Sequence, residues 1–168
     1  MNTAARIYDG VFNLLAVIAA LCIALIAILV CTDVILRNAG FPTLPWQIEV
    51  SEYAQFVATF LGAPWVLKMG GHVRVDVLLT NLKPAKAFFL EIVADVLGLI
   101  ASGFLFAYGL YTVYLTWRDN QLQIKMLIVP EWWIYSVVVV SGLLLMAEFI
   151  RRLRRAHSVR RGGATVQI

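Results

Sequence analysis

The chain has 168 residues, of which 61% are hydrophobic and only 14% are charged, and its formal net charge is +4. A soluble domain is on average about 45–50% apolar and about 25% charged, so this chain is too apolar to cover itself with polar surface in water. The composition excludes a soluble enzyme and a disordered tail. It also argues against a nucleic-acid binder, because most of the excess positive charge is one arginine cluster near the C-terminus.

Four uncharged stretches predict an all-α integral membrane protein with four transmembrane helices. They are residues 11–32, 53–67, 96–117 and 132–147. A helix needs roughly 20 apolar residues to cross a hydrocarbon core of about 30 Å, so the first and third stretches suffice alone. The second and fourth suffice if their flanking acids lie at the interface; the alternative for these two is a soluble core. We place the helices at residues 8–37, 45–69, 85–118 and 130–155.

The first helix has an uncharged run of 22 residues, longer than the 7–15 residues typical of a cleaved signal peptide. We therefore interpret it as a retained helix. At its C-terminal end, Asp33 and Arg37 are four residues apart and can pair along the helix.

The second helix is predicted to begin at Pro45 and carries Glu49 and Glu52 near its start, where acids interact favourably with the helix dipole. Two hypotheses remain open for these charges. Either they only stabilise their own helix ends, or Arg37 bridges to one of the two glutamates and fixes both helix ends for a partner. Further along, Pro64 predicts a bend, because its nitrogen has no proton for the helical hydrogen bond to Phe60.

The loop after the second helix contains the most distinctive polar stretch of the chain, residues 70–77. Apolar residues spaced at i, i+3, i+4 and i+7 over residues 75–82 predict a short amphipathic helix on the cytoplasmic surface. A lone histidine in a loop is usually only solvated. The candidate residues of this cytoplasmic-loop motif are Gly71, His72, Arg74 and Asp76.

Small residues spaced four apart predict faces through which three of the helices pack, because close approach drives helix association in lipid. The alternative is that alanine is simply common in membrane helices. The candidate faces are Ala16, Ala20 and Ala24 in the first helix, Ala54, Ala58 and Gly62 in the second, and Ala94, Gly98 and Ser102 in the third.

The distribution of Lys and Arg predicts that both termini are cytoplasmic. Eleven of these residues fall on the side of the termini and the second loop, and only Arg37, Arg118 and Lys125 on the other side. Residues 156–168 are predicted to form a basic cytoplasmic tail. The preceding arginines, which set topology and can also bind anionic phospholipid, are Arg151, Arg152, Arg154 and Arg155.

The sequence offers little chemistry. Cys22 and Cys31 are predicted to lie on opposite faces of one helix, and His72 and His157 lie in cytoplasmic segments, which argues against a disulfide oxidase and a haem protein. We find no phosphate-binding loop or metal-ligand spacing, and expect no enzyme activity and no cofactor. The uncharged helix interiors also argue against a solute route within this chain, because carriers usually keep polar groups at the midplane.

Taken in order, several short motifs resemble the small membrane subunit, the DctQ type, of tripartite ATP-independent periplasmic (TRAP) transporters. The resemblance covers nearly the whole chain. Its departures from the family pattern include Ile48 where a second acid is common before Glu49. The motifs are Asp33-x-x-x-Arg37-Asn38, Pro45-Trp46-x-x-Glu49, Phe60-Leu61-Gly62-Ala63, Gly71-His72-Val73-Arg74-Val75-Asp76, and Pro130 before Trp132.

The resemblance implies a multi-pass protein of the bacterial inner membrane. A periplasmic binding protein would capture an organic acid or related solute, and a large multi-span permease subunit (DctM-type) would carry it inward with sodium. The small subunit would brace the permease and add to the docking surface. On this analogy the residues facing the binding protein are Asp33, Arg37, Asn38, Trp46, Glu49, Glu52, Arg118 and Trp132.

Two other functions remain open from the sequence. One is a self-sufficient, homo-oligomeric small membrane transporter, and the other is a non-transport membrane scaffold or assembly factor. The first would transport alone in vesicles, whereas the second would contact a permease without affecting sodium-driven uptake once that permease has matured.

Overall fold

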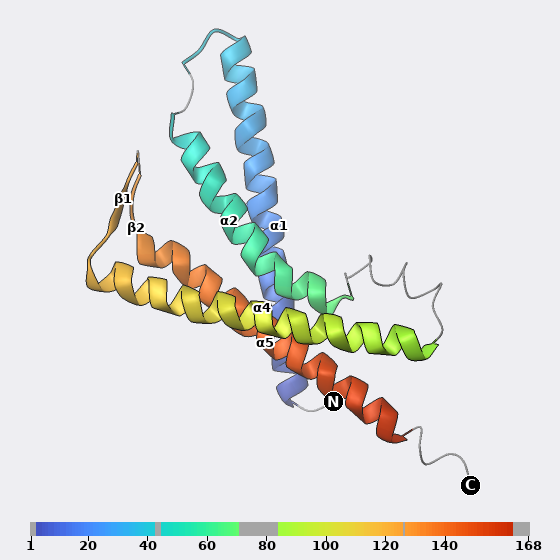
Figure 1. Cartoon of the computed structure of the whole chain (residues 1–168). Coiled ribbons are helices and arrows are strands. Elements are labelled where there is room, and N and C mark those ends of the chain that lie inside the picture. Colours follow the sequence, from blue (N-terminus) through green and yellow to red (C-terminus); the bar gives the residue numbers. More distant parts are fainter. Residues whose placement is uncertain (1–2, 43–44, 71–83, 126, 163–168) are drawn as a thin grey trace.

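The structure is a computed structural model that describes residues 3–42, 45–70, 84–125 and 127–162. Four long helices dominate these residues (Figure 1). Their bounds are Thr3–Asn38 for α1, Pro45–Lys68 for α2, Pro84–Arg118 for α4 and Glu131–Gly162 for α5.

The helices form two antiparallel pairs that cross one another (Figure 1). α1 packs along α2, α4 packs along α5, and the two pairs meet where α2 lies against α5. We call the end formed by the C-termini of α1 and α4 the hairpin end. The opposite end, where α1 begins and α5 carries its arginines, is the arginine end.

A short β-hairpin, which the sequence analysis did not predict, joins α4 to α5. Its strands are β1, Leu122–Ile124, and β2, Ile128–Pro130, and they pair antiparallel with Leu122 opposite Pro130. The described part of the chain is therefore all-α apart from this connection. Asn120 has a φ of 46° just before β1, a left-handed conformation that asparagine tolerates better than most residues.

Three of the helices are long and apolar enough to cross a membrane: residues Tyr8–Asn38, Phe89–Arg118 and Glu131–Arg155. α2 has 24 residues, which is about 36 Å at 1.5 Å per residue. It does not reach the same apolar composition, since it contains two glutamates and Pro64. The fourth span therefore stays a prediction, as does the side of the membrane on which the termini lie.

Large apolar side chains lie mostly on the outside and small or polar ones lie between the helices. Leu21 and Ile28 on α1 are each 64% exposed, whereas Ala19, Ala54 and Ser141 are buried. A soluble core has the opposite arrangement. This distribution is typical of helices whose outer surface meets lipid and whose contacts use small residues.

Candidate functional site

At the hairpin end, the start of α2 holds the loop of the β-hairpin. Glu52 Oε2 lies 2.7 Å from Lys125 Nζ, and the backbone N–H of Leu127 donates to Glu49 Oε2 over 2.7 Å. Glu49 is buried with 9% of its surface exposed. We call these four residues the latch: Glu49, Glu52, Lys125 and Leu127.

The latch also affects the charge state of its lysine. The pKa of Lys125 is raised from its ordinary value of 10.5, chiefly because its ammonium donates a hydrogen bond to Glu52. The Lys125 ammonium also lies 6.0 Å from the centre of the Tyr53 ring. The ion pair therefore extends the charged form of Lys125, which is already present at neutral pH, to higher pH.

The end of α1 has its own polar contacts. Arg37 pairs with Asp33 at 3.1 Å along the helix, and the side-chain amide of Asn38 donates to the carbonyl of Val34 over 3.0 Å. The hypothesis of an ion pair from Arg37 to Glu49 or Glu52 is not supported: the ion pair seen for Arg37 is with Asp33. The sequence analysis missed Lys125 as the partner of Glu52, since a loop lysine 73 residues away has no spacing signal.

The remaining residues expected at this end lie on three different elements. Trp46 is in the first turn of α2 and is 41% exposed. Arg118 is the last residue of α4, and Trp132, near the start of α5, packs edge-on against Trp133 with ring centres 5.7 Å apart. The expected periplasmic-face residues thus lie on the ends of four different helices. Docking at this end stays a prediction.

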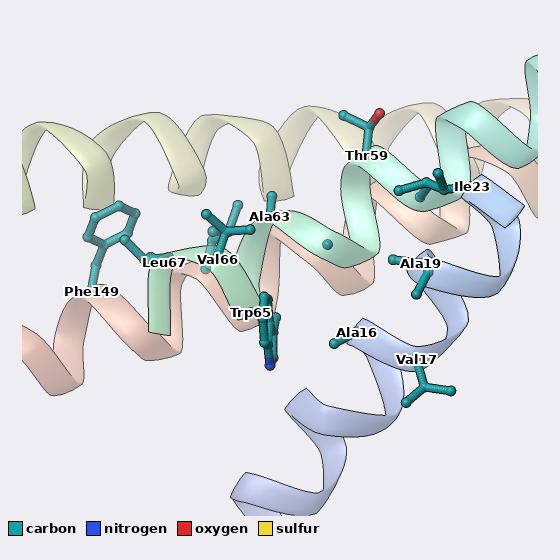
Figure 2. Close-up of a pocket in the computed structure, with 14 residues that line it drawn as sticks. Ala16, Val17, Ala19, Ile23, Thr59, Ala63, Trp65, Val66, Leu67 and Phe149 are labelled. Carbon is teal, nitrogen blue, oxygen red and sulfur yellow. The ribbon is translucent and has the colours of Figure 1, made fainter. Parts of the chain in front are cut away.

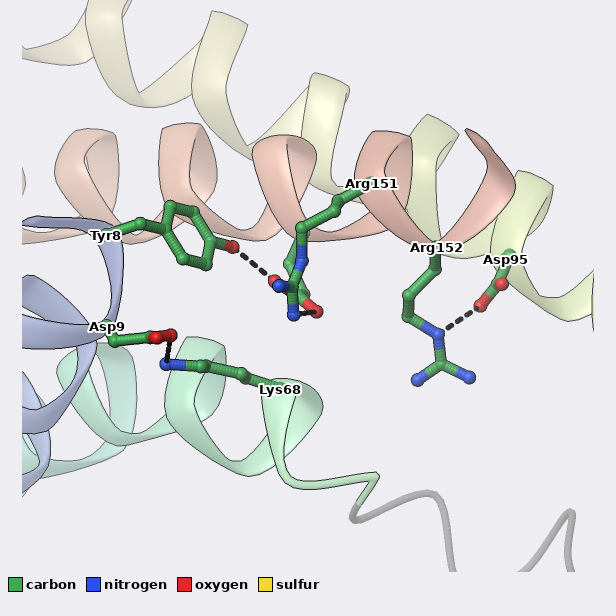
Figure 3. A network of polar contacts seen from close by, with 7 residues as sticks. Tyr8, Asp9, Lys68, Asp95, Arg151 and Arg152 are labelled. Atoms are coloured by element: carbon green, nitrogen blue, oxygen red, sulfur yellow. Dashed lines mark hydrogen bonds and ion pairs between the residues drawn. The ribbon is translucent and has the colours of Figure 1, made fainter. Parts of the chain in front are cut away.

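At the arginine end, a cluster of charged and polar side chains joins α1, α2 and α5 (Figure 3). The Tyr8 hydroxyl donates to a carboxylate oxygen of Glu148, and Arg151 pairs with the other oxygen at 2.8 Å. Asp9 pairs with Lys68 at 2.6 Å. We call these five residues the inner cluster. Glu148 is only 1% exposed, so this buried carboxylate is held by hydrogen-bond donors from two helices.

A second pair at this end joins α5 to α4. Arg152 Nε lies 3.1 Å from Asp95 Oδ1 (Figure 3). Its Nη2 lies 3.8 Å from Glu91, and Asp95 is 3% exposed. The sequence analysis assigned the arginines to topology and lipid. Two of them, Arg151 and Arg152, also pair with acids of this chain, whereas Arg154 and Arg155 are exposed. The sequence did contain a hint of these pairs. Glu148 lies three residues before Arg151 on the same helix, and Asp95 is an acid within the predicted third helix that could pair with an arginine of the fourth.

Small residues of the candidate faces lie at several of the helix contacts. A Cβ built on Gly98 would overlap the ring of Phe149, and one on Gly62 would lie 3.7 Å from Ala19. Ser102 is 3% exposed and donates to the carbonyl of Leu99 in its own helix. Ala54 and Ala58 are buried as well. The glycine that most closely meets a neighbouring backbone, Gly142, was not among the predicted ones.

An open apolar groove of about 860 Å³ lies between α1 and α2 (Figure 2). Its walls include Ala16 and Ala19 of α1, Gly62 and Trp65 of α2, and Phe149 of α5. With such walls it can accommodate an apolar helix or an acyl chain and offers little to a charged solute.

The cytoplasmic-loop motif lies outside the described residues. This applies to Gly71, His72, Arg74 and Asp76 and to the amphipathic helix expected at residues 75–82. Within the described ranges, no group of three or more His, Cys, Asp or Glu side chains is arranged to hold a metal ion. Among the described polar groups, some bond within their own helix, as Thr32 and Asn38 do, and others join two helices, as Glu148 and Asp95 do.

Comparison with known proteins agrees with the motifs. The family model for the DctQ component of tripartite ATP-independent periplasmic transporters matches residues 26–158. A protein of Haemophilus influenzae named "Putative TRAP transporter small permease protein" is 30% identical over 131 residues, which cover 78% of this chain and 80% of that protein. With this match and its long apolar helices, the chain belongs to the DctQ family and is a multi-pass membrane component of a TRAP transporter.

Proposed function

We propose that the chain is the small permease subunit of a sodium-driven, binding-protein-dependent transporter for organic acids or related solutes. The observation that carries this proposal is the family match over residues 26–158. The subunit lies in the bacterial inner membrane with both termini in the cytoplasm. Its partners are a large multi-span permease subunit, a periplasmic substrate-binding protein and phospholipids.

Its role is to brace the large permease subunit rather than to conduct the solute. The support is the distribution of charge: the ion pairs of the described residues gather at the hairpin end and at the arginine end of the molecule, as in the latch and the inner cluster. The groove between α1 and α2 is lined by apolar side chains apart from Thr59. A route for a charged solute needs polar groups in the middle of the membrane. A brace needs packing faces and fixed helix ends.

The hairpin end is the side that faces the binding protein in this proposal. Its exposed charges include Arg37, with 68% of its side chain exposed, and Glu52, with 55%. Exposed charges of both signs suit a docking surface that must release its partner, since such contacts set association rate and specificity more than affinity.

The test is reconstitution. Co-expression with the neighbouring large permease gene should give a stoichiometric complex, and proteoliposomes holding that complex should take up solute only with a sodium gradient and the binding protein. Uptake by the small subunit alone would favour the homo-oligomeric transporter. Full sodium-driven uptake by the mature permease without this subunit would favour an assembly factor.

Glu49→Gln tests the docking part of the proposal. The substitution keeps a side-chain oxygen that can accept from Leu127 N–H and removes only the negative charge. We expect unchanged membrane insertion with weaker complex formation or a higher half-saturating concentration of binding protein in uptake. Unchanged complex yield together with unchanged uptake would remove Glu49 from the docking surface.

A further inference from the structure

One face of the β-hairpin is apolar and exposed. Leu122 lies opposite Pro130 in the register, so both belong to one face of the ribbon, and Ile128, two residues from Pro130, shares that face. Leu122 is 51% exposed and Ile128 is 67% exposed. On the other face, Gln123 and Val129 are half-buried.

The latch keeps this ribbon in a fixed position. Lys125 pairs with Glu52, and the N–H of Leu127 donates to Glu49, so the loop end of the hairpin is tied to the first turns of α2. At its other end, the N–H of Glu131 donates to the carbonyl of Gln121 over 3.2 Å. The loop end of the ribbon is therefore attached to α2, and its other end continues directly into α4 and α5.

The hairpin also lies directly beside two membrane-spanning helices. Only residues 119–121 separate α4 from β1, and α5 begins at Glu131, immediately after β2. Trp117 at the end of α4 is 63% exposed and Trp133 at the start of α5 is 60% exposed. Exposed tryptophans at the ends of spanning helices typically lie at the level of the lipid headgroups. A three-residue strand spans only about 10 Å, so the whole ribbon is close to that level.

We propose that the apolar face of the hairpin, formed by Leu122 and Ile128, inserts into the headgroup region of the bilayer beside α4 and α5. A two-stranded ribbon is only marginally stable in water, and an exposed apolar strand invites aggregation. Contact with lipid would stabilise the ribbon and keep its apolar face from aggregating. The same lipid would cover the adjoining apolar surface of α4 and α5. This inference rests on α4 and α5 spanning the membrane and does not depend on sodium coupling, bracing or docking.

The experiment measures where each face of the ribbon lies. Single cysteines replace Leu122, Ile128 or Gln123 in a Cys22→Ser/Cys31→Ser chain, are labelled with an environment-sensitive fluorophore, and are reconstituted in vesicles of phosphatidylcholine and phosphatidylglycerol. Quenching by lipids with a headgroup-level nitroxide should be at least twofold stronger at Leu122→Cys and Ile128→Cys than at Gln123→Cys. Aqueous iodide should quench a label at Asp119→Cys more strongly than labels at the two apolar positions.

The opposite pattern would overturn the proposal. If iodide quenches Leu122→Cys and Ile128→Cys as strongly as Asp119→Cys, the face lies in water. If addition of binding protein then shields them, the face is a protein-docking surface instead. A second variant separates insertion from folding: Leu122→Asp should lower nitroxide quenching at Ile128→Cys at least twofold while the helical circular dichroism is unchanged. Equal quenching with and without Leu122→Asp also contradicts insertion.

Discussion

The hydroxyl of Ser141 on α5 donates a hydrogen bond of 2.5 Å to the carbonyl of Phe60 on α2. This is the carbonyl that Pro64, four residues further along, cannot bind because a proline nitrogen carries no proton. Ser141 is completely buried. A side chain of the second helical pair therefore satisfies the backbone group that the proline leaves free, at the contact between the two pairs.

Replacing Ser141 by alanine should weaken the contact between α2 and α5. Hydrogen bonds between membrane helices contribute about 0.6 kcal/mol on average and up to about 1.7 kcal/mol, and we expect a loss near the upper figure because the Phe60 carbonyl is left without a donor. The measurement is the free energy of unfolding in mixed micelles, with Ser136→Ala as the control, since the Ser136 hydroxyl donates within its own helix.

The same contact can be tested through Pro64. In Pro64→Ala the new amide can bind the Phe60 carbonyl, so Ser141→Ala should cost less in that background than in the wild type. Equal costs in both backgrounds would mean that the hydroxyl does not compensate for the proline.

The position of Pro64 and its effect on Phe60 were predictable because both follow from local chain geometry. The partner was not, since Ser141 lies 81 residues away on another helix and serine has no distinctive spacing. The latch illustrates the same limit. The sequence indicated that Glu49 and Glu52 belong to a helix start and offered Arg37 as one possible partner, but it held no signal for Lys125, which lies 73 residues from Glu52.

The partners of the arginines at the arginine end could not be predicted, for a different reason. Counting Lys and Arg predicts orientation from the sum of the charges and contains no information about partners. In the structure, Arg151 and Arg152 face Glu148 and Asp95, two acids that hydropathy alone reads as the ends of membrane spans. Buried pairs between an arginine and an acid can be identified only once the packing of the helices is known.

Glu148→Gln should destabilise the attachment of α1 to α5. The substitution removes the charge that Arg151 pairs with and alters the acceptor for Tyr8, in a site that is only 1% exposed. We expect a loss of about 1–3 kcal/mol in unfolding free energy. Glu91→Gln is the matched control: its side chain is 48% exposed and its pair is 3.8 Å long, so it should change stability by less than about 1 kcal/mol. Similar losses for both variants would contradict a special role for Glu148.

Gly142→Ala should separate α4 from α5. A Cβ at this position would lie 3.0 Å from the backbone nitrogen and 3.1 Å from the Cα of Phe106, and backbone atoms cannot rotate away as a side chain can. We expect a loss of about 1–3 kcal/mol from overpacking. Gly103→Ala, where nothing lies within 4 Å, should be neutral or stabilising because alanine favours the helix. A neutral Gly142→Ala would mean that the helices approach less closely than described.

Loss of the Lys125–Glu52 pair should release the loop of the β-hairpin, and alkaline pH should do the same. Because the folded pKa of Lys125 is raised, the pair contributes fully below the ordinary value of 10.5 and is lost as the pH rises through the raised value. A nitroxide attached at Ile128→Cys should therefore be more mobile above that pH than at neutral pH. In the Glu52→Gln variant, the nitroxide at position 128 should be mobile at neutral pH and at alkaline pH alike. A label at Phe104→Cys, an exposed position on α4, is the control and should not respond to either change. If the label at position 128 is equally immobile in Glu52→Gln at neutral pH, the Glu49 contact with the Leu127 amide alone is sufficient to hold the loop.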